Sequence, residues 1–256
     1  YMGGYEKSIH YFRRALEIDT RLNKKEYMGI NLSNLGKVFE AWKQSEKAID
    51  FYRQALSISL ELQDSNSMAI RMSNIGTSYL SLQKFDSAFQ YLSKAYEIDS
   101  VRKNTGRLAA RLDLIGVLYQ RQEKYDLAQQ YFSKALTSVN DKNQASSKAI
   151  ILSNWGKNSL YMGQWDKAEE YLTSGLKLAS EFGLAHTILN NYQALSELNK
   201  KRANFEKSLH YLELYSKLRD SVFSTQSQKS INEFQVLYET EKKDAAITLL
   251  NQQQKI

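Results

Sequence analysis

The side chains of this chain that could bind a metal or act as acid–base catalysts are few and far apart. None of its three histidines, His10, His186 and His210, lies at the helical spacing that brings two ligands onto one face. Adjacent carboxylates such as Glu169 and Glu170 have no nucleophile or base in a catalytic arrangement with them. The chain has no cysteine, which excludes disulfides, thiolate metal sites and cysteine nucleophiles. The sequence therefore predicts no enzyme, no metal site and no cofactor.

A set of amide, hydroxyl and basic side chains recurs at a fixed spacing of 40 residues and could bind a peptide. The set comprises Asn34, Asn74 and Asn154; Ser33, Ser73 and Ser153; and Lys37 and Lys157. Arg71 and Arg111 are equivalent under the same spacing, and we expect them at the edge of the same surface. Asparagine offers hydrogen-bond donors and an acceptor together, as a peptide group requires. The set could equally link neighbouring helices, and Leu114 interrupts it, so both interpretations stay open.

The period of 40 residues also runs through the apolar part of the sequence. One column of small residues reads Gly36, Gly76, Gly116, Gly156 and Ser196. A second small column reads Ser8, Ala48, Ala88, Ala128, Ala168 and Ser208, and a bulky one reads Phe12, Tyr52, Leu92, Phe132, Leu172 and Leu212. Two helices approach closely where one side chain is small and a large neighbour fills the space beside it. A fixed period of this length indicates a stacked repeat array.

One repeat can be read from residues 33–56. Ala48, Tyr52 and Ala55 lie at spacings of four and three residues, which place them on one helical face. A polar break at Lys43–Gln44 precedes this face, and the equivalent positions carry Gly163–Gln164 and Gly3–Gly4. Glycine at such a break predicts a tight turn between two antiparallel helices.

This pattern resembles the tetratricopeptide repeat, and it recurs through residues 5–215. The resemblance rests on Gly36, Phe39, Ala48, Tyr52 and Ala55. The usual period is about 34 residues, so six further residues predict roughly 9 Å of added helix per repeat. Longer helices would also explain why the usual proline is missing, since the chain has none. The resemblance implies an all-α fold, a superhelical α-solenoid of antiparallel helix pairs with a long C-terminal helix.

The resemblance also implies a binding surface. In this family the first helices line a concave groove, and residues that match Asn34, Asn74 and Asn154 often hold the backbone of a bound peptide. We therefore expect a protein or peptide ligand in this groove. The groove would be lined by Ser33, Asn34, Lys37, Arg71, Ser73, Asn74, Arg111, Ser153, Asn154 and Lys157. Arrays of this kind usually present surfaces rather than perform chemistry.

The chain divides into two predicted parts. Residues 1–220 form the array, with the second helix of repeat 1, complete repeats 2–5 and a degenerate repeat 6. Residues 221–256 contain no glycine or proline and predict a long capping and linker helix that leads toward a presumed membrane segment. Its second apolar stripe, at residues 246–250, could pair with another copy, which predicts a homodimer through this helix.

The tail carries a second resemblance. Asp220–Ser221, followed by YETEKK at 238–243 and ITLL at 247–250, is similar to the junction in bacterial membrane sensors. Those proteins join an extracytoplasmic tetratricopeptide domain to a transmembrane helix and a histidine-kinase or helix-turn-helix output. The resemblance implies a periplasmic sensor domain of an inner-membrane protein, excised from a longer chain and with its membrane tether outside this fragment. The alternative is a cytoplasmic scaffold or peptide receptor.

The formal net charge of +7 raises the question of a nucleic-acid partner. The basic residues are interleaved with acids, and the densest group, Arg102, Lys103, Arg107 and Arg111, accompanies no nucleic-acid-binding motif. The sequence therefore predicts a solvated surface and no nucleic-acid partner.

Overall fold

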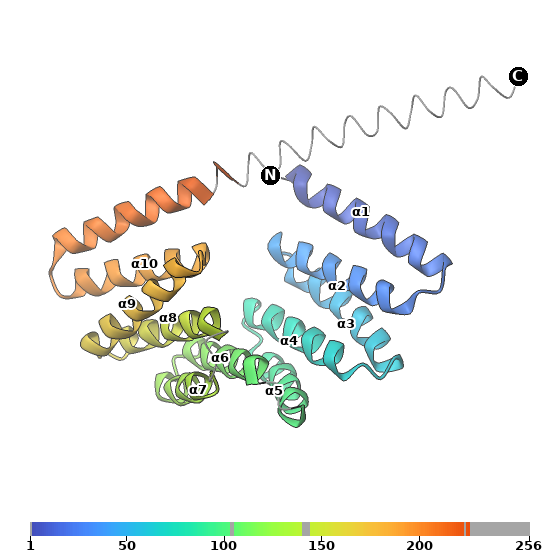
Figure 1. Ribbon diagram of the computed structural model, residues 1–256, viewed down its shortest axis with the longest axis horizontal. Helices are drawn as coiled ribbons and strands as arrows, with labels where there is room; N and C mark the ends of the chain where they lie inside the picture. The colour runs from blue at the N-terminus through green and yellow to red at the C-terminus, as the bar shows by residue number, and fades with distance from the viewer. Residues whose placement is uncertain (1, 103–104, 140–143, 223, 226–256) are drawn as a thin grey trace, which may run out of the picture.

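The computed structural model describes residues 2–102, 105–139, 144–222 and 224–225, and this part of the chain contains helices and turns but no strand. The predicted all-α class is confirmed. Ten helices carry labels in Figure 1, and an eleventh, without a label, spans residues 205–222. The labelled helices are α1 (Met2–Arg21), α2 (Lys25–Ala41), α3 (Ser45–Glu61), α4 (Ser65–Ser81), α5 (Phe85–Val101), α6 (Thr105–Arg121), α7 (Tyr125–Thr137), α8 (Ala145–Tyr161), α9 (Trp165–Glu181) and α10 (Ala185–Lys201).

The turns that the structure describes in full share one geometry. At the end of α2, Gln44 N–H donates to Phe39 O at 2.8 Å and Lys43 N–H donates to Glu40 O at 2.9 Å. This bond pair defines the Schellman motif, in which the reversing residue takes a positive φ. Among the described residues, positive φ recurs at intervals of 20 or 40 residues, at Asn23, Lys43, Gln63, Gln83, Glu123, Gly163, Gly183 and Ala203. The predicted turns at Lys43–Gln44 and Gly163–Gln164 are confirmed.

The prediction of a turn at Gly3–Gly4 is wrong, because α1 begins at Met2 and contains both glycines. Helices tolerate glycine with a modest loss of stability, so glycine alone does not determine a turn.

The helices of the repeats are long, except for α7, which has 13 residues. Helices α2 to α6 and α8 to α10 each have 17 residues, so the 40-residue period consists of two equal halves. The added residues are therefore shared between the first and the second helix. Longer helices bury a longer apolar stripe against the next repeat.

The small columns lie where the two helices of a repeat cross. A Cβ atom added to Gly36 would lie 2.5 Å from Cε1 of Tyr52, and one added to Gly116 would lie 2.6 Å from Cε1 of Phe132. Ala88 on α5 is fully buried, as are its equivalents Ala48, Ala128 and Ala168. The expectation that a large side chain fills the space beside a small one is confirmed.

The repeats stack in an arc with α1 at one end and helix 205–222 at the other (Figure 1). Beyond sequence neighbours, even-numbered helices touch one another: α4 contacts α6, α6 contacts α8, and α8 contacts α10. Helices α2 and α4 contact each other less closely than α6 and α8 do. The even-numbered helices, which are the first helices of the repeats, therefore form the inner row of the arc.

Two sequence predictions fall at the end of the chain. From residue 226 onward, the predicted capping and linker helix lies outside the described residues, as do both of its apolar stripes. Helix 205–222 spans the predicted boundary at residue 220. Within the described residues, no helix combines the length and apolar character needed to cross a membrane.

Candidate functional site

All ten predicted binding residues lie on inner-row helices, but they differ in burial. The two lysines, Lys37 on α2 and Lys157 on α8, are exposed, and the three asparagines are partly buried. The remaining five are buried: Ser33 on α2, Arg71 and Ser73 on α4, Arg111 on α6, and Ser153 on α8. Burial matters because a buried polar atom without a partner is destabilising, so its hydrogen bonds indicate its role.

Between α6, α8 and α10, the predicted residues hydrogen-bond to neighbouring helices. Asn154 Nδ2 donates to Asp113 Oδ1 at 3.1 Å and to Oδ2 at 2.9 Å. Ser153 Oγ accepts from Asn191 Nδ2 at 2.6 Å and donates to Ala149 O at 2.8 Å. At Asn154 and Ser153, these hydrogen bonds favour the packing interpretation.

Arg111 is likewise satisfied within the protein. Its Nε donates to Asp99 Oδ2 at 3.2 Å, and its Nη1 donates to Ser73 Oγ at 2.7 Å. The side chain of Asp99 is fully buried, and the side chain of Arg111 is 10% exposed. The buried ion pair joins α5 to α6, and the hydrogen bond to Ser73 adds α4, so Arg111 and Ser73 link three helices of the stack.

Arg71, one period before Arg111, has no such partner. Within the described residues, its Nη1 donates to Ser67 O on the same helix, at 3.3 Å, and its Nε is buried without a hydrogen bond. The position equivalent to Asp99 is Ser59, whose hydroxyl donates to Ala55 O at 3.0 Å. Among the described residues, no carboxylate lies within ion-pair distance of Arg71, and burial lowers its pKa.

Asn74 differs from Asn154 in the same way. Its Nδ2 is buried and has no partner in the described part of the chain. Asn154 is satisfied by Asp113, but the residue equivalent to Asp113 beside α4 is Ser33. On α2, Asn34 Oδ1 accepts from Lys37 Nζ at 3.5 Å. On α4, the described part of the protein thus leaves two buried donors, Arg71 Nε and Asn74 Nδ2, without an acceptor.

Asp113 and Asn191 were not among the predicted site residues. Burial raises the pKa of Asp113 to about 7, and the hydrogen bond from Asn154 opposes that rise. Two hydrogen-bonded pairs include these residues, and each pair is separated in sequence by close to one period. Asp113 and Asn154 are 41 residues apart, and Ser153 and Asn191 are 38 apart. This separation is the sequence pattern that could have identified them.

The described members of the basic group from Arg102 to Arg111 differ in burial and in partners. Arg111 is buried against Asp99, and Arg107 Nη1 donates to Asn66 Oδ1. Arg102 is exposed, and Lys103 lies outside the described residues. Of the described members, one is therefore buried in an ion pair and another is hydrogen-bonded within the array.

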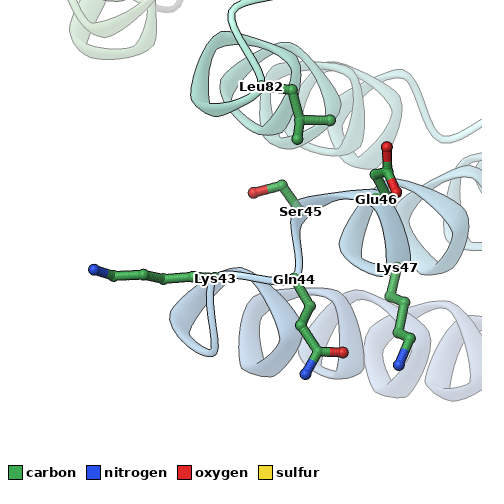
Figure 2. A pocket seen from close by; sticks show the side chains of 6 residues that line it. All are labelled: Lys43, Gln44, Ser45, Glu46, Lys47 and Leu82. Atoms are coloured by element: carbon green, nitrogen blue, oxygen red, sulfur yellow. The ribbon is translucent and has the colours of Figure 1, made fainter.

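A shallow hollow at the turn between α2 and α3 is lined by Lys43, Gln44, Ser45, Glu46, Lys47 and Leu82 (Figure 2). A similar hollow lies about one period later, at residues 83–87 and Gln122. Because the hollow recurs, we attribute it to the geometry of the repeat and not to the binding of a specific ligand. In the described part of the chain, no cluster of three metal-ligating side chains occurs.

These features define the class of protein: an α-solenoid whose inner face carries polar side chains. The family model for the tetratricopeptide repeat matches residues 1–61 and 67–141, more than half of the chain, so the chain belongs to this family. A comparison with curated proteins gives no significant match.

Several solved structures have a similar fold. The apo form of RapI superposes with a TM-score of 0.71 at 19% identity, covering 88% of this chain and 80% of RapI. BtubC (BKLC) from P. vanneervenii gives 0.68 at 18% identity, covering 85% of this chain and 92% of BtubC. A Rap protein complexed with Competence and Sporulation Factor gives 0.62 at 16% identity, covering 87% and 72%. At these identities the likeness shows the fold.

Proposed function

We propose that this chain is a non-catalytic module that binds a peptide or an extended protein segment on its inner face, at α2 and α4. One observation carries the proposal. Arg71 and Asn74 leave buried donor atoms unused, whereas their equivalents Arg111 and Asn154 are hydrogen-bonded within the array. Unused buried donors are destabilising, and a ligand that accepts their hydrogen bonds would remove that effect.

The family supports this function by analogy. Repeat arrays of this type usually act through extended surfaces. One structure of similar fold is a Rap protein complexed with Competence and Sporulation Factor. The asparagine at Asn74 suits an extended ligand, because its amide can pair with a peptide group.

For the biological setting, we propose a signal-transduction receptor in which this module senses the ligand. The tail pattern at residues 220–250 supports an extracytoplasmic sensor with a histidine-kinase or helix-turn-helix output and a homodimer through the C-terminal segment. The fold shared with Rap proteins supports a cytoplasmic peptide receptor instead. Sequencing the gene beyond the codon of Ile256 distinguishes these two settings, because codons for about 20 consecutive apolar residues would indicate a membrane anchor.

The binding function can be tested with a random peptide library displayed on phage. Peptides selected on the wild-type chain are measured by calorimetry against Asn74→Ala and Asn154→Ala. Loss of one hydrogen bond should weaken binding to Asn74→Ala by roughly 2- to 12-fold, with little change in stability.

Asn154→Ala is the matched control. It leaves Asp113 without its amide donor, so we expect lower stability and nearly unchanged affinity. A library that yields no binder, or binders that ignore the Asn74 substitution, would refute the proposed site.

A further inference from the structure

We propose that one edge of the array docks on the surface of a membrane that contains anionic lipids. At this edge the second helix of one repeat passes to the first helix of the next, at the ends of α1, α3 and α5. We call it the inter-repeat edge, and its residues are 21–27, 60–64 and 101–102. It is a different surface from the inner face, so the proposal does not depend on ligand binding at α2 and α4.

The inter-repeat edge exposes large apolar side chains. They are Val101 at 85% exposure, Leu22 at 57%, Tyr27 at 55%, Leu60 at 52% and Leu62 at 45%. At the opposite edge of the array, where residues 42–45 and 82–85 join the two helices of one repeat, the large apolar side chains are at least half-buried. Large apolar groups that gather on one exposed surface indicate an interaction site.

These side chains lie at helix ends and turns, and not along the face of one helix. Leu22 lies in the turn after α1, Leu62 caps the end of α3 one period later, and Val101 is the last residue of α5. The turns after α1 and α3 lie on the same side of the arc (Figure 1). A protein partner would need a surface that matches these separate tips closely, whereas lipid headgroups and acyl chains can rearrange around them.

Basic side chains accompany the apolar ones. Arg21 and Lys24 are exposed at the end of α1 and in the turn after it, and Arg102 is exposed directly after α5. Within the described residues, none of these three cations lies within ion-pair distance of a carboxylate. Lys24 Nζ lies 5.7 Å from the centre of the Tyr27 ring. A tyrosine ring with a lysine beside it is suited to the boundary between headgroups and acyl chains.

The carboxylates of this edge are mostly engaged within the protein. Glu61 Oε2 lies 2.9 Å from Lys25 Nζ, and Asp64 accepts hydrogen bonds from two backbone amides at the start of α4. Glu26 is the other exposed carboxylate among the residues of this edge. The three cations therefore remain available for lipid phosphates, and each one should strengthen binding to an anionic surface about fivefold.

The test uses sedimentation of the chain 1–256 with sucrose-loaded vesicles. One set of vesicles is pure phosphatidylcholine, and the other contains about one third phosphatidylglycerol, which gives it a negative surface potential. The chain should sediment with the anionic vesicles and remain largely in solution with the neutral ones. Binding should weaken as salt is added, because ions screen the attraction between the edge and the lipids.

Two edge variants separate the apolar and the electrostatic contributions. Val101→Ser should weaken binding to anionic vesicles about fivefold, because the exposed valine no longer enters the apolar layer. Lys24→Gln combined with Arg102→Gln should weaken it about fivefold for each cation removed. All three side chains are exposed, so the thermal midpoint should stay close to that of the wild type.

The opposite edge supplies matched controls. Leu127→Ser removes an apolar side chain that is exposed near the start of α7, and Lys43→Gln with Lys124→Gln removes two exposed cations. These variants change the composition and the net charge as the edge variants do. They should leave binding to anionic vesicles nearly unchanged.

Insertion of the edge can be observed directly, because the chain has no cysteine and a single introduced thiol can be labelled. An environment-sensitive fluorophore on Val101→Cys should shift its emission to the blue with anionic vesicles and should be quenched by brominated lipid. The same fluorophore on Leu127→Cys should show neither change.

The proposal is wrong if the chain does not bind anionic vesicles, or if the controls weaken binding as much as the edge variants do. A lipid-free dimer that Val101→Ser abolishes would assign the edge to a second copy of the chain and would also refute it. Peptide binding fails or stands separately, because Lys24→Gln with Arg102→Gln leaves Asn74 intact and should bind library peptides as the wild type does.

Discussion

Asp113 is the inner-face carboxyl whose protonation changes near neutral pH. Burial raises its pKa from an ordinary 3.8 to about 7, so the folded protein holds a proton that the unfolded chain releases. This linkage stabilises the folded state fully below about pH 4, weakens as pH rises toward 7, and is lost above that value.

Asp113→Asn should remove this pH dependence, because the amide carries no charge to desolvate. At pH 8 the variant should be more stable than the wild type, by at most about 4 kcal/mol, since one pKa unit corresponds to about 1.4 kcal/mol. At pH 4 the two proteins should differ little. Urea unfolding across this pH range measures the effect, with the exposed Asp126→Asn as control. Parallel pH profiles for Asp113→Asn and wild type would contradict the raised pKa.

The residue types on the inner face could be read from the sequence, but their roles could not. Asn74 and Asn154 occupy one column, yet only Asn154 has an acid opposite it. The role of each residue depends on the identity of a neighbour 38 or 41 residues away, so a column taken alone does not reveal it. A comparison of each polar residue with the residues 38 and 41 positions away would have identified the pair of Asp113 and Asn154.

Glycine residues within the helices have two different roles, and the stabilities of alanine variants should distinguish the two. A Cβ at Gly116 would lie 2.6 Å from the Phe132 ring, but a Cβ at Gly29 would lie no closer than 3.5 Å to Ile58. We expect Gly116→Ala to destabilise the array by about 1–3 kcal/mol through overpacking. Gly29→Ala should stabilise α2 by about 0.5–1 kcal/mol, because alanine favours a helix. Urea unfolding of both variants would test this, and equal effects would contradict the assigned crossing point.

The turns between helices offer a second comparison. Glu123 has a φ of 59°, in the left-handed region that glycine adopts without strain, and Gly163 occupies the same place one period later at 72°. Glu123→Gly should therefore stabilise the protein slightly, while Gly163→Ala should destabilise it by about 1 kcal/mol. Thermal unfolding of the two variants measures both signs. A loss of stability in Glu123→Gly would mean that chain entropy outweighs backbone strain at this turn.

At the scale of the whole molecule, the stack should be least stable at its ends. Interior helices are covered on both sides, whereas α1 leaves Tyr11 and Ile18 each 44% exposed, and helix 205–222 leaves Phe205 66% exposed. Because neighbouring repeats supply most of the stability, amide hydrogen exchange in the chain 1–256 should be fastest in α1 and helix 205–222 and slowest in α5 to α8. Equal protection along the array would show that it unfolds in one cooperative step.

The fold class was predictable because every repeat carries the same information. The column of Gly36 and the column of Tyr52 meet at each crossing, so one pattern is confirmed several times along the chain. The curvature was not predictable, since it depends on how closely α2, α4, α6 and α8 approach one another. Those distances depend on many small contacts between repeats, which a single column does not reveal.

The regular spacing of the turns also determines which insertions and deletions in the gene would preserve the fold. Loss or gain of 40 residues by unequal recombination keeps every column in place, so the product can still stack. Loss of 20 residues would put a first helix where a second belongs and would disrupt the crossings. Because each repeat contacts mainly its neighbours, substitutions at α2 and α4 can accumulate with little effect on the packing of α8 to α10.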